Sequence, residues 1–320
     1  MNKILFTGLI ILFLVSVINP SVAIDNVKKS SFPISKGNTL YVGGSGPNNY
    51  TKIQDAIDNS SDEDSVFVYD DSSPYYGKIR VHKSINLMGE NKNTTVISAI
   101  NSHSCLVSIN ANFVNISGFT IKNGQEGIIG IRLKNCTIYD NNIINNHMGI
   151  HLFGSNNFTF IYNNISNNKY GGFYLEACYN LSIRENIIDY NRVYGILLFG
   201  SINSTIIKNS FLGNGEGLEF LSTNNIVVHF NNIKNNDIGF FMGYSDKTLI
   251  KQNNFIKNEI HFLFCFSFRI RFVSNYWDDW IGVKIKLPLF NRFPKIIWYQ
   301  GSFRPKIDWI PSKEPYDIKV

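Results

Sequence analysis

Four residues with side chains suited to sugar binding stand at equivalent places in this sequence: His151, Tyr174, Glu176 and Glu219. Each lies two or four residues after a glycine that recurs every 22 or 23 residues. Aromatic faces stack on sugar rings, and carboxylate and imidazole groups form hydrogen bonds with hydroxyls. We therefore predict that these residues line a binding site for a polysaccharide or a cell-surface glycan.

The two carboxylates of this set are too far apart for glycosidase chemistry. Glu176 and Glu219 are two repeats and two residues apart, which at the strand spacing separates them by roughly 12 Å. Paired glycosidase carboxylates lie about 5–5.5 Å or about 6.5–9.5 Å apart. We therefore predict no catalytic residue and no cofactor, and we keep a polysaccharide lyase or glycoside hydrolase as an alternative function.

A repeat running from Asn135 to Trp277 supplies the elements that would position these residues. Its apolar reference position is occupied by Ile138, Phe160, Ile183, Ile206, Val228, Ile250 and Phe272, and an asparagine follows three residues later in every copy. Apolar alternation after each glycine indicates short strands, and Asn and Gly favour the bends between them. We predict an all-β, right-handed parallel β-helix, a solenoid of about ten coils with ~22 residues each.

We expect columns of side chains to point into this solenoid. Ile150 and Leu152, Phe160, Ile165 and their equivalents in other copies are the predicted inward positions. The asparagines should stack above one another and form amide ladders from coil to coil.

The N-terminus has the features of an export signal. Lys3 is followed by an apolar run from Ile4 to Ile18 and by the small-residue site Ser21-Val22-Ala23, so residues 1–23 are predicted to be a signal peptide. The expected location is extracellular, at the cell surface or in a periplasm-like space. The signal segment, if uncleaved, is the one predicted membrane contact.

The remaining chain divides into three predicted segments: a linker at 24–38, the β-helix at 39–277 and a C-terminal capping tail at 278–320. A helix at Thr51–Asn59 is expected to cover the first coil. Thr51 and Gln54 have the spacing of a capping box at its start.

Several stretches resemble a known group of proteins. They are Tyr50-Thr-Lys-Ile-Gln-Asp-Ala-Ile, Ser65-Val-Phe-Val-Tyr, Ile85-Asn-Leu-Met-Gly-Glu and Asn115-Ile-Ser-Gly-Phe-Thr-Ile. Together they resemble NosD-like and pectate-lyase-like right-handed β-helix proteins, over most of the chain after the linker. Asn275-Tyr-Trp-Asp-Asp-Trp resembles the closing motif of archaeal surface members. The resemblance implies the β-helix fold and an exported surface protein.

The same resemblance implies an alternative role as a periplasmic copper-binding accessory protein that helps to mature a copper enzyme. Copper requires converging His, Cys or Met side chains. His147, Met148 and His151 are close in sequence, so His147 and His151 are the weaker, alternative metal ligands. The main prediction is a non-catalytic surface scaffold or binding protein without a metal.

The four cysteines do not indicate a disulfide framework. Cys136 and Cys178 are two coils apart, roughly 9.6 Å along the axis, and bridged Cα atoms are rarely more than about 7 Å apart. We expect free thiols. The formal charge of +6 comes from scattered rather than clustered basic residues, so no nucleic-acid partner is predicted, and no oligomeric state is indicated.

Sequons for N-glycosylation are frequent. They start at Asn49, Asn59, Asn93, Asn115, Asn135, Asn157, Asn164, Asn180 and Asn203. Four of them fall in one repeat column, so the repeat itself creates the motif, whether or not a glycan is attached.

One predicted outward face is unusually apolar. Its residues Phe153, Leu197, Phe199, Leu221, Phe241 and Leu263 alternate with buried positions. Monomers rarely expose large apolar patches, and the tail after Trp280 is rich in apolar residues and proline. We expect the tail to cap the last coil through Trp277 and Trp280 and then to cover this stripe.

Overall fold

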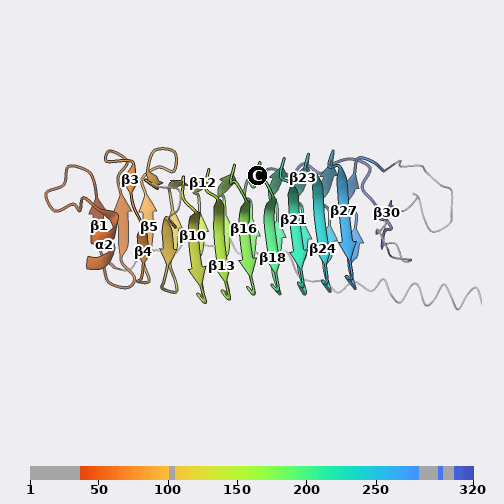
Figure 1. The fold of residues 1–320 in the computed structure, drawn as a ribbon, viewed down its shortest axis with the longest axis horizontal. Helices are drawn as coiled ribbons and strands as arrows, with labels where there is room; N and C mark the ends of the chain where they lie inside the picture. The colour runs from red at the N-terminus through yellow and green to blue at the C-terminus, as the bar shows by residue number, and fades with distance from the viewer. Residues whose placement is uncertain (1–36, 101–104, 281–294, 298–305) are drawn as a thin grey trace, which may run out of the picture. The chain divides into compact units, whose positions relative to one another are not determined.

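The computed structural model describes residues 37–100, 105–280, 295–297 and 306–320 (Figure 1). Residues Ser35–Val320 form one compact unit, distinct from Met1–Ile34. The predicted signal peptide (1–23) and the linker up to residue 36 lie outside the described residues. Within the described ranges, no helix has the length and apolar character needed to cross a membrane.

The chain winds as a parallel β-helix, which confirms the predicted fold (Figure 1). Sheet A stacks eleven parallel strands, one from each successive coil. These are β1 (Thr39–Val42), β2 (Ser65–Val68), β5 (Asn86–Gly89), β8 (Asn115–Ser117), β11 (Thr137–Tyr139), β14 (Thr159–Ile161), β17 (Ser182–Arg184), β19 (Thr205–Ile207), β22 (Val227–His229), β25 (Leu249–Lys251) and β28 (Arg271–Val273). The repeat frame of the sequence therefore extends into the irregular first coils.

Sheet B follows sheet A in each coil and is divided into two blocks. The first holds β3 (Tyr75–Tyr76), β6 (Val96–Ser98), β9 (Thr120–Lys122), β12 (Asn142–Ile144) and β15 (Asn164–Ser166), and the second β20 (Ser210–Leu212), β23 (Asn232–Lys234), β26 (Asn254–Ile256) and β29 (Tyr276–Trp277). Ile187 bridges Asn164 and Ser210 between the blocks, so the stacking continues through the gap.

Sheet C has the longest strands and carries all four predicted binding residues. It is built from β4 (Ile79–Val81), β7 (Val107–Ile109), β10 (Glu126–Ile131), β13 (Met148–Phe153), β16 (Gly171–Glu176), β18 (Tyr194–Phe199), β21 (Glu216–Leu221), β24 (Ile238–Gly243) and β27 (Ile260–Cys265). Its strands from β10 to β27 pair in parallel register. Equivalent residues of successive coils consequently lie side by side.

The predicted inward columns form the core. Ile150, Leu152, Phe160 and Ile165 are completely buried, as are most of their equivalents. Aromatic rings pack edge to face within this core, for example Phe160 on Phe173 with ring centroids 5.0 Å apart. All four cysteines are free, as expected from their spacing.

Two inner asparagine ladders run along the bends at either side of sheet B. The first is Asn141, Asn163, Asn186, Asn209, Asn231, Asn253 and Asn275, and the second is Asn146, Asn168, Asn191, Asn214, Asn236 and Asn258. Within a ladder, most amide nitrogens donate to the amide oxygen of the next coil, as Asn209 does to Asn231 at 3.0 Å. Each of these buried amides also donates to a main-chain carbonyl, as Asn209 does to Ile183 and Asn214 to Ile188. The ladders therefore provide hydrogen-bond partners for buried carbonyl groups near the bends.

The N-terminal helix α2 is Ile53–Asn59, and the predicted capping box is wrong. Lys52 is the N-cap residue and no side chain caps the helix. Gln54 instead accepts a hydrogen bond from the main chain of Arg80 at 2.8 Å. Tertiary contact with β4 therefore replaces the local cap, while Ile53, Ala56 and Ile57 cover the core as expected.

The described part of the tail closes the last coil, and its C-terminal residues do not lie on the predicted apolar stripe. Trp277 is buried and stacks on Phe255, and Trp280 packs against the core. Strand β30 (Lys295–Ile297) pairs antiparallel with β31 (Lys306–Asp308), which joins sheet A beside β28.

Residues 312–318 then return along sheet B, not along the apolar stripe of sheet C. Tyr316 exchanges two main-chain hydrogen bonds with the Asn254 side chain, at 2.8 and 2.9 Å, and Asn232 donates to the carbonyl of Ile318. Outward asparagines on sheet B can pair with an extended main chain, whereas apolar side chains on sheet C cannot. Residues 281–294 and 298–305 lie outside the described part of the tail.

Candidate functional site

Three columns of residues run along sheet C besides the core columns, and in the first of them Met148, Gly171 and Tyr194 are buried. The first is Glu126, Met148, Gly171, Tyr194, Glu216, Ile238 and Ile260; the second is Ile129, His151, Tyr174, Leu197, Glu219, Phe241 and Leu263; the third is Ile131, Phe153, Glu176, Phe199, Leu221, Gly243 and Cys265. The second and third columns contain the predicted outward positions in the predicted register.

The sequence did not predict the first column, because inward and outward positions do not alternate strictly along these strands. In β21 the recurring glycine Gly217 and the next residue Leu218 are both buried, so Glu216 and Glu219 both face outward. An added Cβ at Gly217 would lie 2.6 Å from the carbonyl oxygen of Gly239, which explains the glycine. The first column could therefore have been found in the sequence as the residue that precedes each recurring glycine.

Three of the four predicted binding residues lie in contact. The rings of His151 and Tyr174 stack with centroids 4.9 Å apart and planes at 20°. The Tyr174 hydroxyl donates to Glu176 Oε2 at 3.0 Å, and His151 Nδ1 lies 3.8 Å from Glu126 Oε1. Burial, together with the Glu176 carboxylate, raises the pKa of Tyr174. An aromatic stack is therefore bordered by acids at both ends.

Glu219, the fourth, is separated from Tyr174 by Leu197 and has Glu216 beside it on the same strand. Glu216 Oε2 is buried and has no hydrogen-bond partner among the described residues. Burial, followed by the charge of Glu219, raises the pKa of Glu216 to about 7. Burial also raises the pKa of Glu219.

Tyr194 connects the two groups. It pairs in register with Glu216, and its ring lies over Gly171, where an added Cβ would be 2.1 Å from Cε2 of that ring. Its hydroxyl reaches the Met148 sulfur at 3.8 Å. Tyr194 itself is buried. We call His151, Tyr174, Glu176, Glu216 and Glu219 the aromatic–carboxylate face.

The alternative metal ligands have separate surroundings. His147 stacks on Tyr170, with centroids 5.6 Å apart, and its Nδ1 is 3.3 Å from Gln125 Nε2. His151 belongs to the aromatic–carboxylate face. Neither joins a group of three His, Cys, Asp or Glu ligands within the described ranges.

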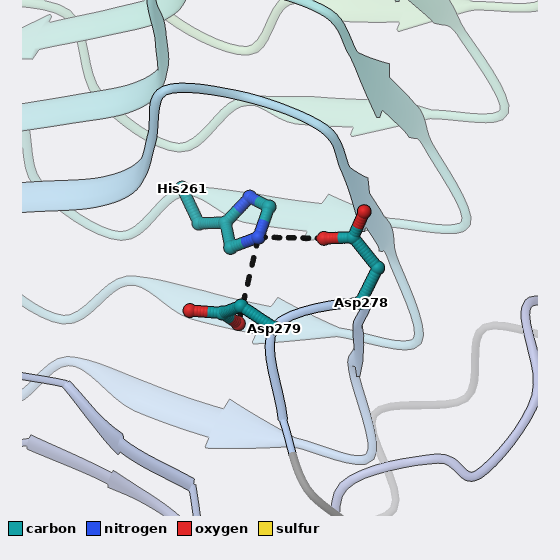
Figure 2. Close-up of side chains that lie close together, drawn as sticks. All are labelled: His261, Asp278 and Asp279. Atoms are coloured by element: carbon teal, nitrogen blue, oxygen red, sulfur yellow. Dashed lines mark ion pairs between the residues drawn. The ribbon is translucent and has the colours of Figure 1, made fainter.

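The described residues do contain one such group elsewhere, His261, Asp278 and Asp279, whose ligand atoms lie within 4.8 Å of one another. Figure 2 shows the imidazole directed between the two carboxylates. His261 Nε2 is 2.8 Å from Asp278 and 3.5 Å from Asp279. Lys295 Nζ also lies 2.6 Å from Asp279 Oδ2, so the Asp279 carboxylate already forms an ion pair with a lysine of the chain.

The other nitrogen of His261 ends the second inner asparagine ladder. Asn258 Nδ2 lies 3.1 Å from His261 Nδ1. The orientation of this amide is fixed, because its oxygen accepts from Asn236 and its nitrogen donates to the Ile233 carbonyl. Nδ1 must therefore accept, and Nε2 carries the proton toward Asp278. Burial lowers the pKa of His261, in keeping with a neutral ring.

Comparison with known proteins gives one relative and several structures of similar fold. Over 96 residues, 30% of this chain and 16% of the relative, the sequence is 36% identical to a cell surface glycoprotein of Methanothermus fervidus. The match thus spans a small part of that relative.

Among solved structures, the fold is similar to the Dettilon tailspike protein gp208, with a TM-score of 0.55 and 12% identity over 75% of this chain and 62% of that one. It is also similar to the catalytic domain of a GH87 α-1,3-glucanase, with a TM-score of 0.51 and 14% identity over 75% of this chain and 58% of that one. At such identities, the likeness concerns the fold alone.

The family comparison covers most of the β-helix. Residues 57–279 match the family model described as periplasmic copper-binding protein (NosD). This span runs from within α2, through the coils from β2 onward, to the Asp278 and Asp279 pair. It includes the stretches that begin at Ser65, Ile85 and Asn115. The chain therefore belongs to the NosD family.

Proposed function

We propose that this chain is an exported β-helix protein of the cell surface that binds a polysaccharide on the aromatic–carboxylate face. The observation that carries the proposal is the His151–Tyr174 ring stack with carboxylates on both sides. Apolar sugar faces stack on such rings, and carboxylates accept hydrogen bonds from sugar hydroxyls. Coils spaced about 4.8 Å apart would offer a polymer successive contacts.

Export and a surface location rest on the sequence and on the relative. The N-terminal apolar run and its small-residue site predict a signal peptide. The 96-residue similarity to a cell surface glycoprotein, at 36% identity, supports the same compartment.

A copper role, suggested by the family's description, does not fit the part of the chain that the structure describes. Copper sites use converging His, Cys or Met donors. The cluster at His261 offers one imidazole, and its Nε2 carries a proton because Asn258 donates to Nδ1. Lys295 further competes for Asp279. We therefore assign this cluster to closing the last coil and derive no metal chemistry from it.

Hydrolysis or elimination of a polysaccharide has weaker support than binding. Glu176 and Glu219 are in different columns, with Leu197 and Phe199 between them. A catalytic role would depend on Glu216, whose raised pKa suits an acid near neutral pH.

The test is binding of the full chain to a glycan array, followed by titration with the strongest ligand. Tyr174→Ala removes one ring of the stack and should weaken binding by roughly two- to tenfold, because such stacking is worth about 0.5–1.5 kcal/mol. Tyr244→Ala is the matched control, since Tyr244 is 64% exposed and stacks on Phe266 outside this face. Equal affinities for wild type and Tyr174→Ala would remove the proposal.

A further inference from the structure

The structure separates the nine sequons by the surroundings of their side-chain amides. N-glycosylation joins a sugar carbon to Asn Nδ2, so this nitrogen must be exposed and not engaged in the fold. All nine asparagines are among the described residues. Their burial and hydrogen bonds can therefore be compared one by one.

An outer asparagine column occupies the bend before sheet A: Asn135, Asn157, Asn180, Asn203 and Asn225. All five are exposed, with φ between 52° and 57°. Asn157 Nδ2 donates to Asn135 at 2.9 Å, Asn180 Nδ2 to Asn157 at 3.1 Å, and Asn225 Nδ2 to Asn203 at 2.8 Å. The column thus consists of two hydrogen-bonded runs.

Asn135 and Asn203 stand at the accepting ends of these runs. Each uses its amide oxygen, and its Nδ2 makes no hydrogen bond to the described part of the chain. By contrast, Nδ2 of Asn157 and Asn180 is held along the column. Asn225 starts no sequon, since Val227 follows it two residues later.

The remaining sequons divide in the same way. Asn115 is buried and Asn164 is half-buried. Asn49 and Asn59 use Nδ2 to bind main-chain carbonyls. Asn93 is exposed on a loop, accepts a hydrogen bond from Asn142 and leaves Nδ2 without a partner among the described residues.

We infer that Asn93, Asn135 and Asn203 carry N-linked glycans, and that the other six sequons do not. In each reaction an Nδ2–C1 bond forms while the bond from C1 to the phosphate of an activated glycosyl donor breaks. The amide proton passes to a base of the transferase. Asn135 and Asn203 are three coils apart, roughly 14 Å, which leaves room for a glycan on each, whereas adjacent coils would crowd two glycans.

The test is glycopeptide mass spectrometry of the full chain purified from cells of the organism that encodes it. Peptides with Asn93, Asn135 and Asn203 should gain the mass of a glycan, while those with Asn115, Asn157 and Asn180 should not. Unmodified peptides at all three predicted positions, or glycans on Asn157 and Asn180, would overturn the inference.

Variants expressed in the same cells sharpen this test. Asn203→Gln should lose the mass of one glycan. Thr205→Ala should lose the same mass while keeping the Asn203 amide in the column, so it remains informative if Asn203→Gln does not fold. Thr159→Ala, at the equivalent position after Asn157, should leave the mass of the attached glycans unchanged; a lost glycan would contradict the assignment.

Discussion

Glu216 is the most perturbed acid on the aromatic–carboxylate face. Its Oε2 is buried without a hydrogen-bond partner in the described part of the chain, and Glu219 lies nearby on the same strand. A buried acid without a counter-charge favours its neutral form. In the folded protein, Glu216 therefore binds its proton up to about pH 7, well above its ordinary pKa of 4.5.

The pH dependence of stability should report this proton. Because the pKa of Glu216 is higher in the folded chain than in the unfolded chain, its stabilising effect is present below about pH 4.5 and is lost as the pH rises through about 7. The melting temperature should therefore fall over this window. Glu216→Gln should reduce that fall, and the exposed control Glu259→Gln should retain it. Identical slopes in wild type and Glu216→Gln would show that Glu216 is not the group responsible.

Sequence reasoning identified part of the candidate site at the level of single residues. His151, Tyr174 and Glu176 could be brought together because strict alternation holds for the second half of each strand. Tyr194 and Glu216 could not be assigned to the site from the sequence. The two residues that follow each of them are both buried, so the alternation of inward and outward positions is interrupted there. The partners of His261 could not be predicted from the sequence either, since they depend on how the last coil closes.

At the scale of elements, the inner asparagine ladders hold the bends together. Asn209 donates through Nδ2 to Ile183, Ile207 and Asn231, and its oxygen accepts from the main chain and side chain of Asn186. Its own surface is completely buried. Removal of one rung leaves several buried groups without partners.

Asn209→Ala should lower the free energy of unfolding by about 3 kcal/mol or more, since each unsatisfied buried polar group costs about 1–3 kcal/mol. Urea unfolding monitored by circular dichroism measures this. The control Asn225→Ala removes an exposed amide with one ladder bond and should cost less than about 1 kcal/mol. Similar losses in both variants would indicate that the inner ladders are not a principal source of stability.

The tail supplies the last rung of the first ladder. Asp308 is completely buried and accepts hydrogen bonds from the main chain of Ser274, the main chain and amide of Asn275, and the Trp277 indole. Burial raises the pKa of Asp308, although these four donors oppose the shift. The carboxylate stands where the next coil would place an asparagine.

Asp308→Ala should therefore destabilise the last coils, by about 3 kcal/mol or more, because buried donors lose their acceptor. Asp308→Asn keeps the shape of the side chain and one acceptor oxygen, so it should lower the free energy of unfolding by less than Asp308→Ala does. Melting temperatures in the order wild type, Asp308→Asn, Asp308→Ala are expected. No difference between Asp308→Ala and wild type would mean that the tail does not close the ladder.

The repeat predicted the elements of the coils better than the elements at the ends. A period of 22 or 23 residues assigns inward, outward and bend positions without knowledge of the tertiary structure. Asp308 and the return of residues 312–318 along sheet B follow no repeat, so they could not be predicted without the packed structure. The capping box at Thr51 failed for the same reason, because Gln54 pairs with Arg80 in a later coil.

At the scale of the described unit, Ser35–Val320, the β-helix separates several roles on different sides of one core. Sheet C presents the aromatic–carboxylate face, the bend before sheet A presents the outer asparagine column, and sheet B receives the returning tail. In-register stacking makes each side a set of columns (Figure 1). The proposed glycan contact and the proposed glycan attachments thus use separate columns.

The central claim is that a polysaccharide contacts the aromatic–carboxylate face. Photocrosslinking measures this most directly: the strongest array ligand, carrying a diazirine, is irradiated with the full chain and the crosslinked peptides are identified by mass spectrometry. Crosslinks are expected within Met148–Phe153, Gly171–Glu176, Tyr194–Phe199 and Glu216–Leu221, and an excess of unlabelled ligand should abolish them. Crosslinks concentrated on sheet A, on sheet B or around Tyr244 and Phe266 would contradict it.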